Sequence, residues 1–509
     1  MHPLWDGEAM YAEVPREMLA GRNFLYPTLN YAPFIYKPPL YLWANALSMA
    51  LFGQGTLAFR LPSVLMASLT VFFVYLIAAR FGRKAGLYSG AVMATLYGPV
   101  FHASTLLTDT PLTLFAAAAI YFFLEALEGR SWGIPGVYAC LGLAVMTKGF
   151  IGAVFPGIAI ALFILSTKRL DMARRLASPS GILLFIAITL PWHIMMEAKH
   201  PGFLNAYVID EQLLRSVPTP WFILVTIGWL MPWSFFLVQA LARTIKGIRE
   251  GASMLAFYWG VGGLAFLCLS SSRMEYHTLP VLPAFAVMVG IYWAGLGEGS
   301  RKTEWGAVLG AASLLIFSLA AIFAAPHVIA KLGGLIKSTG ARPSDITALS
   351  VRVFAVLSVG SCLTALLLAV RRHGYAFSAF LVTAALMLIS ARPAIELAAP
   401  GFSSADAAMA VASVARPEDI LVVDGDKEYE LSATFNFYTG KKVYILSNDG
   451  MHKDRFGIDE GEFRTLWSGP KRAYFVTARD PKTGGIAHMP SFWFKGVFKG
   501  NKTVYSNGL

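Results

Sequence analysis

The chain has 509 residues, of which 56% are hydrophobic and only 14% are charged, and its formal net charge is +12. A soluble protein of this length needs more charge to cover its surface, so the composition excludes a soluble globular fold and indicates a polytopic α-helical membrane protein. The basic residues fall in short clusters between apolar runs, without a basic-aromatic patch. This pattern argues against a nucleic-acid partner and for membrane lipids.

The first forty residues are polar, aromatic and acidic, and they hold Asp6, Glu8 and Glu13. Asp6 and Glu8 are separated by one residue, so they can converge on a substrate if the backbone is extended. Such a pair could act as a general base or bind a divalent cation. The alternative is a helix N-terminus, with Asp6 as the cap and acids in the first turn.

Lys37 lies in a turn between Tyr36 and two prolines. A lysine among aromatic residues at a membrane interface can hold a phosphate as a point charge, or it can extend to lipid headgroups. Residues 39–53 are apolar but too short to cross a bilayer, and they predict an interfacial helix. We therefore expect residues 1–61 to form a periplasmic acidic loop with interfacial helices.

About twelve apolar stretches of spanning length follow within residues 62–392 and predict a transmembrane bundle. Cys140, Cys268 and Cys362 each lie inside such a stretch, so we expect packed core residues rather than a disulfide or metal set. The stretches cover residues 62–80, 84–101, 110–128, 133–147, 150–166, 179–197, 220–241, 253–271, 279–296, 305–325, 351–370 and 376–392.

Lys and Arg cluster at alternate connections between these stretches, which marks the cytoplasmic side. The first forty residues, the connections poorer in basic residues and everything after residue 392 then face the periplasm. An even number of spans places both termini outside, although no signal peptide is present, so we expect either one further span before Met1 or an error of one in the count. The basic clusters lie at residues 80–84, 168–175, 243–249, 301–302 and 371–372.

Several outer connections carry residues that suit an anionic, lipid-linked substrate. His102 and Asp109 flank one of these connections, although Asp109 before Pro111 also suits a helix N-cap. Lys148 lies between two spans with no charged partner nearby in the sequence. A cation at such an outer boundary is a modest indication of a phosphate site.

Two later outer segments are denser in polar residues. Residues 191–215 mix both signs of charge and include Glu211. Arg273, Tyr276 and His277 lie just outside a span and suit an anion clamp, although interface packing is the alternative for His277. The spans themselves are nearly free of charge, whereas a transporter favours charges and broken helices at mid-membrane. The pattern therefore favours an enzyme over a transporter.

Residues 393–509 differ in texture from the bundle and predict a small exterior α/β domain. The turn at residues 424–426 follows a predicted strand, and it could bind a ligand or simply be solvated. Buried strands are expected at 420–423, 442–446 and 472–477, and helices at 404–415 and 428–437.

A series of short motifs runs through residues 1 to about 300. The motifs are Asp6 to Glu13, Tyr36 to Pro39, Arg60 to Ser63, Thr147 to Gly149, Pro191-Trp192 and Arg273 to Pro280. In order and spacing they resemble the GT-C class of membrane-embedded glycosyltransferases, which use polyprenyl-phosphate sugars. Within that class the chain is similar to the bacterial relatives of protein O-mannosyltransferases, one of which transfers 4-amino-4-deoxy-L-arabinose to lipid A.

The resemblance implies a GT-C-like bundle with a first transmembrane helix ahead of the acidic motif. It also implies that an acid of the first loop, Asp6 or Glu8, is catalytic and that Lys37 contacts the carrier phosphate. The family commonly reads Asp-Glu before Ala-Arg-Tyr-Ala-Glu. Here Gly7 stands where that Asp would be, and Met10 replaces the Arg. Asp6 is the preferred acid because Gly7 could let the loop present it.

The expected reaction is an inverting transfer of a sugar from an undecaprenyl-phosphate carrier to lipid A or another envelope glycolipid, at the outer face of the inner membrane. Lys37, with Arg273 or Lys148, would stabilise the departing phosphate, and Asp6 or Glu8 would orient or deprotonate the acceptor. The alternatives are protein O-glycosylation and the transport of a lipid or sugar-lipid. No cofactor is expected apart from a divalent cation that the outer acids could bind. The residues expected to bind the carrier phosphate or the sugar are Tyr36, Lys37, Arg60, His102, Asp109, Lys148, Glu211, Arg273, Tyr276 and His277.

Overall fold

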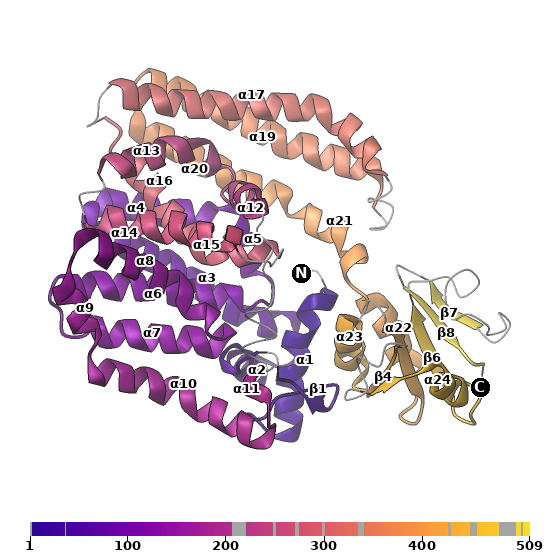
Figure 1. Ribbon diagram of the computed structural model, residues 1–509. Coiled ribbons are helices and arrows are strands. Elements are labelled where there is room, and N and C mark those ends of the chain that lie inside the picture. Colours follow the sequence, from indigo (N-terminus) through magenta and orange to yellow (C-terminus); the bar gives the residue numbers. More distant parts are fainter. Residues whose placement is uncertain are drawn as a thin grey trace.

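The computed structural model shows a helical bundle with a small α/β domain at one end (Figure 1). The N-terminal helices lie between the bundle and this C-terminal domain, where they contact both. The structure describes residues 3–35, 37–205, 220–247, 251–269, 274–297, 301–333, 341–425, 429–447, 456–477, 495–499 and 502–508.

Helix α1 (Asp6–Gly21) begins with a capping box around the extended residue Trp5. The Trp5 backbone N–H donates to Glu8 Oε2 at 3.0 Å, so the side chain of Glu8 satisfies a free backbone donor at the helix start. Trp5 is therefore the N-cap and Asp6 is the first helical residue. This corrects the alternative that Asp6 is the cap.

A short hairpin and a second helix follow α1. Strands β1 (Thr28–Leu29) and β2 (Ala32–Pro33) pair antiparallel, and α2 (Leu40–Phe52) forms where an interfacial helix is predicted. Leu47, Leu51 and Phe52 of α2 are each at least 60% exposed. Such a row of apolar side chains suits the boundary between lipid headgroups and acyl chains.

The bundle contains a helix over each of the twelve predicted stretches, but several differ in length or continuity. Leu96 in extended backbone divides the stretch 84–101 into α4 and α5, and the helices over 220–241 are bent by 106°. Among the described residues, eight helices are long and apolar enough to cross a membrane, or nine if the bent pair forms one span. Hydropathy predicts where the chain is apolar, but not where an apolar segment bends. The bundle helices are α3 (Thr56–Ala78), α4 (Arg83–Thr95), α5 (Tyr97–Ala103), α6 (Asp109–Leu127), α7 (Gly133–Lys148), α8 (Ile151–Thr167), α9 (Leu170–Leu176), α10 (Pro179–Lys199), α12 (Trp221–Trp229), α13 (Leu237–Lys246), α14 (Gly251–Phe257), α15 (Gly263–Leu269), α16 (Leu282–Ala294), α17 (Arg301–Lys331), α19 (Pro343–Ala369), α20 (His373–Ala391) and α21 (Pro393–Phe402).

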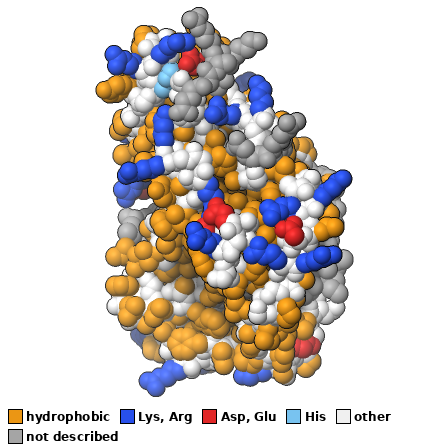
Figure 2. Space-filling model, turned by 90° about the vertical axis from the view of Figure 1, so that its left-hand side faces the viewer, with side chains coloured by type: hydrophobic (Ala, Val, Ile, Leu, Met, Phe, Trp, Pro, Cys, Tyr) orange, Lys and Arg blue, Asp and Glu red, His pale blue; other side chains and the backbone are white. Residues whose placement is uncertain are grey.

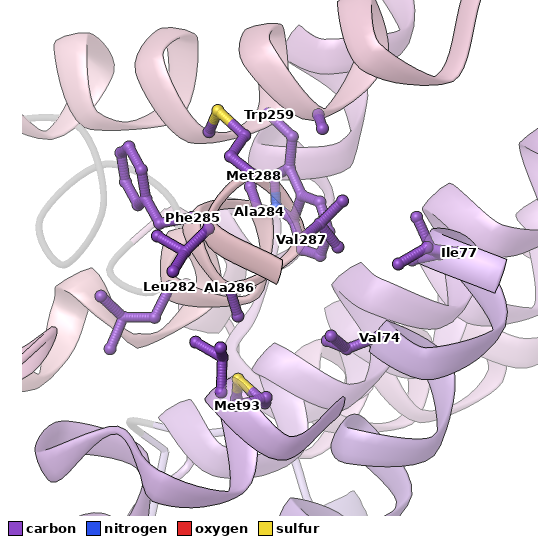
Figure 3. Close-up of a cluster of buried hydrophobic side chains, with 14 of the residues drawn as sticks. Val74, Ile77, Met93, Trp259, Leu282, Ala284, Phe285, Ala286, Val287 and Met288 are labelled. Atoms are coloured by element: carbon purple, nitrogen blue, oxygen red, sulfur yellow. The ribbon is translucent and has the colours of Figure 1, made fainter. Parts of the chain in front are cut away.

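The centre of the bundle is formed by α16 and α6, whose side chains are mostly buried, whereas fewer than a third of the residues of α10, α17 and α19 are buried. Figure 3 shows side chains of α16, including Phe285 and Met288, packed among Val74, Met93 and Trp259 from other helices. Gly290 of α16 allows α4 to approach closely, since a Cβ there would lie 2.4 Å from the backbone of Ser89. The outer helices present apolar side chains as expected for lipid contact.

The end of the bundle opposite the C-terminal domain is rich in basic side chains. Figure 2 views this end, where Lys and Arg are more plentiful than Asp and Glu on a largely hydrophobic surface. The connections predicted to be cytoplasmic therefore lie together at one end of the bundle, and that they face the cytoplasm stays a prediction. Exposed examples are Arg83, Lys84, Lys168, Arg174, Arg175, Lys246, Arg371 and Arg372.

The C-terminal domain is a six-stranded sheet in the order β5-β4-β3-β6-β8-β7, with helices on both faces. The predicted strands and helices of this domain are all present. Strands β5, β7 and β8 and helix α24 were not predicted, because they are short or of mixed polarity. The elements are α22 (Ala405–Val414), β3 (Ile420–Asp424), α23 (Tyr429–Thr439), β4 (Val443–Leu446), β5 (Gly457–Ile458), α24 (Glu460–Trp467), β6 (Ala473–Thr477), β7 (Lys495–Lys499) and β8 (Thr503–Ser506).

The three cysteines are free, as predicted, but only one of them is a core residue. Cys140 is buried, whereas Cys268 is half-buried and Cys362 is exposed on α19. An apolar run in a membrane protein does not distinguish a lipid-facing position from a packed one, because both environments select apolar side chains.

Candidate functional site

Asp109 and Lys148 form a buried ion pair where two helices end. Helices α6 and α7 are packed neighbours joined by a short turn, so the start of α6 lies beside the end of α7. Lys148 Nζ lies 2.6 Å from each carboxylate oxygen of Asp109, and the two side chains are 10% and 2% exposed. The helix dipoles favour an acid at a helix start and a cation at a helix end. Gly149 ends α7 at a φ of 86°, which favours glycine.

The pair gathers other predicted residues from distant parts of the chain. Lys148 Nζ lies 5.6 Å from the centre of the Tyr276 ring, within the range of a cation–π contact. Lys37 is close enough to act electrostatically on both Asp109 and Lys148, and both lysines act on His277. Two cations therefore converge on one carboxylate, beside an aromatic ring and an imidazole. Thr108 is the N-cap of α6, so Asp109 is one residue inside the helix rather than its cap.

Tyr11 of α1 also reaches this group, although its sequence context predicts no role in a site. Its hydroxyl group bonds Thr108, and it lies within electrostatic range of Asp109 and Tyr276. Burial raises the pKa of Tyr11 far above its ordinary value, so the phenol stays protonated. A tyrosine on a helix usually reads as a core residue. The one indication of its role is its spacing of three residues from Glu8. On a helix this spacing places both side chains on one face, so Tyr11 could be expected near the same site.

His102 lies beside the same group, with 3% of its surface exposed. Its ring is 5.1 Å from that of Trp229 and 6.2 Å from that of Tyr276, centre to centre. Nδ1 lies 3.3 Å from Thr105 Oγ1, whereas Nε2 has no hydrogen-bond partner within the described part of the chain. A buried ring nitrogen in this state is available to a substrate hydroxyl group.

Glu8 and Arg60 form a second buried ion pair next to this group. The two side chains are 4% and 5% exposed and approach to 3.6 Å. Glu8 Oε1 also accepts a hydrogen bond of 2.9 Å from the Leu106 backbone N–H, three residues before Asp109. Burial raises the pKa of Glu8, and the nearby Arg60 guanidinium opposes this rise. Both oxygens of Glu8 thus hold the start of α1 against the bundle.

Asp6 faces the C-terminal domain. Its carboxylate accepts hydrogen bonds from the Ser404 backbone N–H at 2.9 Å, from Ser404 Oγ at 2.8 Å and from Thr434 Oγ1 at 2.8 Å. Each oxygen of Asp6 therefore already has a partner in that domain. Two acids were predicted to be catalytic. Asp6 binds the C-terminal domain, and Glu8 caps the start of α1.

Three of the predicted binding residues, Tyr36, Glu211 and Arg273, lie outside the described residues. A metal centre was left open by the sequence. Within the described ranges no group of three or more His, Cys, Asp or Glu side chains is arranged to hold a metal ion. In the C-terminal domain, Asp424 accepts a hydrogen bond of 2.7 Å from Thr477 Oγ1, and Asp426 of the same turn is not described.

A largely apolar groove of about 450 Å³ opens between α3, α5 and the α20–α21 junction. It lies on the other side of α5 from His102, since Tyr97, Val100 and Phe101 form part of its wall. Arg60 lines the groove and also pairs with Glu8, so the second ion pair borders this space.

A separate acidic cluster lies further along α1. Glu13 is fully buried, Glu17 is 5% exposed one helical turn away, and Arg16 makes two hydrogen bonds of 2.6 Å to Glu13. Burial raises the pKa of Glu13 to about 8, and Glu17 adds to the rise while Arg16 opposes it. At neutral pH Glu13 is therefore protonated and adds no negative charge to this buried cluster.

The cluster predicts a pH dependence of stability that Glu13→Gln removes. The pKa of Glu13 is raised from 4.5 to about 8 in the fold. The stability that it contributes is therefore complete below pH 4.5 and is lost as the pH rises through about 8. Thermal unfolding in detergent between pH 5 and 9 measures this effect. The stability of the variant relative to the wild type should increase as the pH rises. Glu460→Gln is the control, because Glu460 is only half-buried and pairs with Arg464. A constant difference between the Glu13 variant and the wild type would contradict the prediction.

The chain has relatives of known activity. A family model described as dolichyl-phosphate-mannose-protein mannosyltransferase matches residues 36–195. The undecaprenyl phosphate-α-4-amino-4-deoxy-L-arabinose arabinosyl transferase of Erwinia tasmaniensis is 28% identical over 345 residues, which are 63% of this chain and 61% of that protein. A transferase of the same description from Proteus mirabilis is 29% identical over 57% of this chain and 55% of its own length. The match thus spans less than two thirds of these relatives.

Solved structures share the whole architecture. The crystal structure of ArnT from Cupriavidus metallidurans without ligand covers 100% of this chain and 94% of its own, with a TM-score of 0.83 at 24% identity. The chain therefore has the fold of ArnT. The structure of the same ArnT bound to undecaprenyl phosphate covers 99% of this chain with a TM-score of 0.84 at 23% identity. The predicted fold class is confirmed: a multi-pass membrane protein of the GT-C type with a small sheet domain.

Proposed function

We propose that this chain belongs to the ArnT family and transfers a sugar from a polyprenyl-phosphate carrier to a lipid acceptor. The observation that carries the proposal is the buried Asp109–Lys148 pair with Lys37 beside it, at the end of the bundle nearer the C-terminal domain. Two lysines around one carboxylate leave a net positive charge, which suits a phosphate. The Erwinia and Proteus relatives are transferases of an undecaprenyl-phosphate-linked sugar, and the Cupriavidus structure binds undecaprenyl phosphate.

In this proposal the lysines bind the carrier phosphate as the leaving group. The bond from the anomeric carbon to the phosphate oxygen breaks, and the electron pair stays on that oxygen. Lys37 and Lys148 stabilise the negative charge that develops there, an effect that is strong where water is excluded. The Tyr276 ring keeps the ammonium of Lys148 at this position.

Asp109 is the acid best placed for the acceptor side. In the structure its charge is neutralised by Lys148, and an arriving phosphate competes for that lysine. Asp109 is then free to accept the proton of an acceptor hydroxyl group as its oxygen attacks the anomeric carbon from the opposite face. An acceptor that is itself an anionic phosphate has no proton to lose, and Asp109 then orients it. A catalytic role for Asp6 or Glu8 stays a prediction. The hydrogen bonds of both carboxylates do not favour it, because these bonds already occupy their oxygens.

The acceptor is proposed to be lipid A or another envelope glycolipid, with the site on the periplasmic side of the inner membrane. The basic end of the bundle supports this orientation, because the site lies at the other end (Figures 1 and 2). The family model supports a second candidate, transfer to a protein hydroxyl group, since its description names a protein mannosyltransferase.

Purified protein in detergent with undecaprenyl-phosphate sugars tests both acceptors. We expect mass spectrometry to find a sugar-bearing lipid A, and we expect Lys37→Ala to reduce the transfer by about 100-fold through the loss of one charged donor. Lys331→Ala, at the end of α17, is the control for loss of a lysine. Product with a peptide alone would select the second candidate, and no product with either acceptor would refute the proposal.

A further inference from the structure

The three hydrogen bonds of Asp6 join the start of α1 to two elements of the C-terminal domain. Ser404 immediately precedes α22, and Thr434 lies in the middle of α23. All three bonds are 2.8 to 2.9 Å long and connect residues about 400 positions apart. A carboxylate that accepts several such bonds holds its partners more firmly than neutral groups do.

Further hydrogen bonds between these parts pair neutral groups. Asn30, in the hairpin after α1, donates to the Val443 carbonyl at 2.7 Å and accepts from the Val443 backbone N–H at 2.9 Å. Asn436 of α23 donates to Asn30 Oδ1 at 2.8 Å. These bonds lie at strand β4 and the far end of α23. At the start of α1, Ser403 Oγ donates to the Leu4 carbonyl at 2.5 Å, and Asp6 adds a charged acceptor beside this neutral bond.

Helix α1 leads from this contact to the candidate site. Glu8 follows Asp6 by two residues and bonds the Leu106 backbone, and Tyr11 bonds Thr108 next to Asp109. Five residues of helix rise only about 7.5 Å, so a shift of the helix start is transmitted to Tyr11. The contact of the domain and the geometry around Asp109 are therefore mechanically linked.

We propose that Asp6 is a positioning residue, which clasps the C-terminal domain to α1 and thereby sets Tyr11 and the segment before Asp109. The effect on transfer rests on the proposed function, whereas the clasp itself does not. On this view the first acid of the opening motif acts through the domain contact rather than on the substrate.

The clasp can be broken from either side, which separates positioning from chemistry. Asp6→Asn removes the charge, and Thr434→Val removes a donor that lies in the C-terminal domain. We expect each variant to lower kcat roughly tenfold, the size expected for one hydrogen bond to a charged group, with KM for the carrier little changed. The double variant should be no worse than either single variant, because both break one contact. Thr439→Val is the matched control, because its hydroxyl bonds the Phe435 carbonyl and the Lys441 backbone N–H but not Asp6.

Amide hydrogen exchange gives a second readout that needs no substrate. Faster exchange in α1 and α23 of Asp6→Asn and Thr434→Val, with an unchanged melting temperature, would support the clasp. The proposal is overturned if Asp6→Asn abolishes transfer while its exchange is unchanged and Thr434→Val is fully active, since Asp6 would then act in the chemistry. If the wild type transfers no sugar, the proposed function fails, and the exchange of the two variants still decides the clasp.

Discussion

Lys148→Met is expected to reduce sugar transfer by about 100- to 1,000-fold, the size of effect seen when one donor to a developing negative charge is removed. Methionine keeps the length and apolar stem of the side chain but not the ammonium. The change also removes the lysine that hydrogen-bonds Asp109, whose side chain is 2% exposed, so we expect the protein to be less stable as well. Initial rates with the carrier-linked sugar and thermal unfolding in detergent measure the two effects separately.

Two variants make the result specific to the phosphate site. Lys148→Met combined with Asp109→Asn removes both charges, so stability should recover while transfer stays lost. Lys199→Met is a matched control, because Lys199 is also the last residue of a helix and its Nζ lies 5.3 Å from the centre of the Tyr26 ring. If the double variant regained transfer together with stability, the pair would be structural and the proposed role of Lys148 would be wrong.

Glu8→Ala is expected to lower the free energy of unfolding by about 3–5 kcal/mol, as when one member of a buried ion pair is removed. The change takes an acceptor from the backbone of Trp5 and from that of Leu106, and it leaves Arg60 buried without its acid. Thermal unfolding in detergent measures the loss. Because the start of α1 would loosen, transfer should fall in parallel with stability.

The C-terminal domain contains a control for Glu8, because Glu462 also occupies the third position of a helix in a capping box. Glu462 closes the capping box of α24, where the Asp459 backbone N–H donates to Glu462 Oε2 at 3.0 Å, but this side chain is exposed. Glu462→Ala should therefore have a small effect, because it removes a cap without uncovering a buried charge. A stable but inactive Glu8→Gln variant would contradict the structural role and restore Glu8 as the catalytic acid.

The class of protein, its apolar segments and the α/β nature of the C-terminal domain are determined by the sequence itself. These features depend on local hydropathy and periodicity, which each segment carries independently of its neighbours. Local hydropathy does not predict where an apolar segment is interrupted. The apolar stretch 84–101 reads as one span, whereas Leu96 divides it into α4 and α5, and α5 is what carries His102 to the site.

The candidate site was partly within reach of the sequence. Asp109 and Lys148 were singled out one at a time, and no partner was recognised for the lysine, because its acid is 39 residues away. Two helices of similar length joined by a short turn must place their free ends together, so the pair follows from the helical hairpin. Tyr11 was missed because nothing in its local sequence separates a site tyrosine from a core one.

The role of Asp6 was decided by tertiary structure alone. Its partners Ser404 and Thr434 are about 400 residues away, in a domain whose position against α1 is set by packing and not by any local pattern. The sequence determines that Asp6 precedes Glu8 and Tyr11, the residues of α1 that reach the site. Only the fold decides that this acid faces the domain, because a side chain two residues from Glu8 points in a different direction on a helix than on the extended loop that was expected.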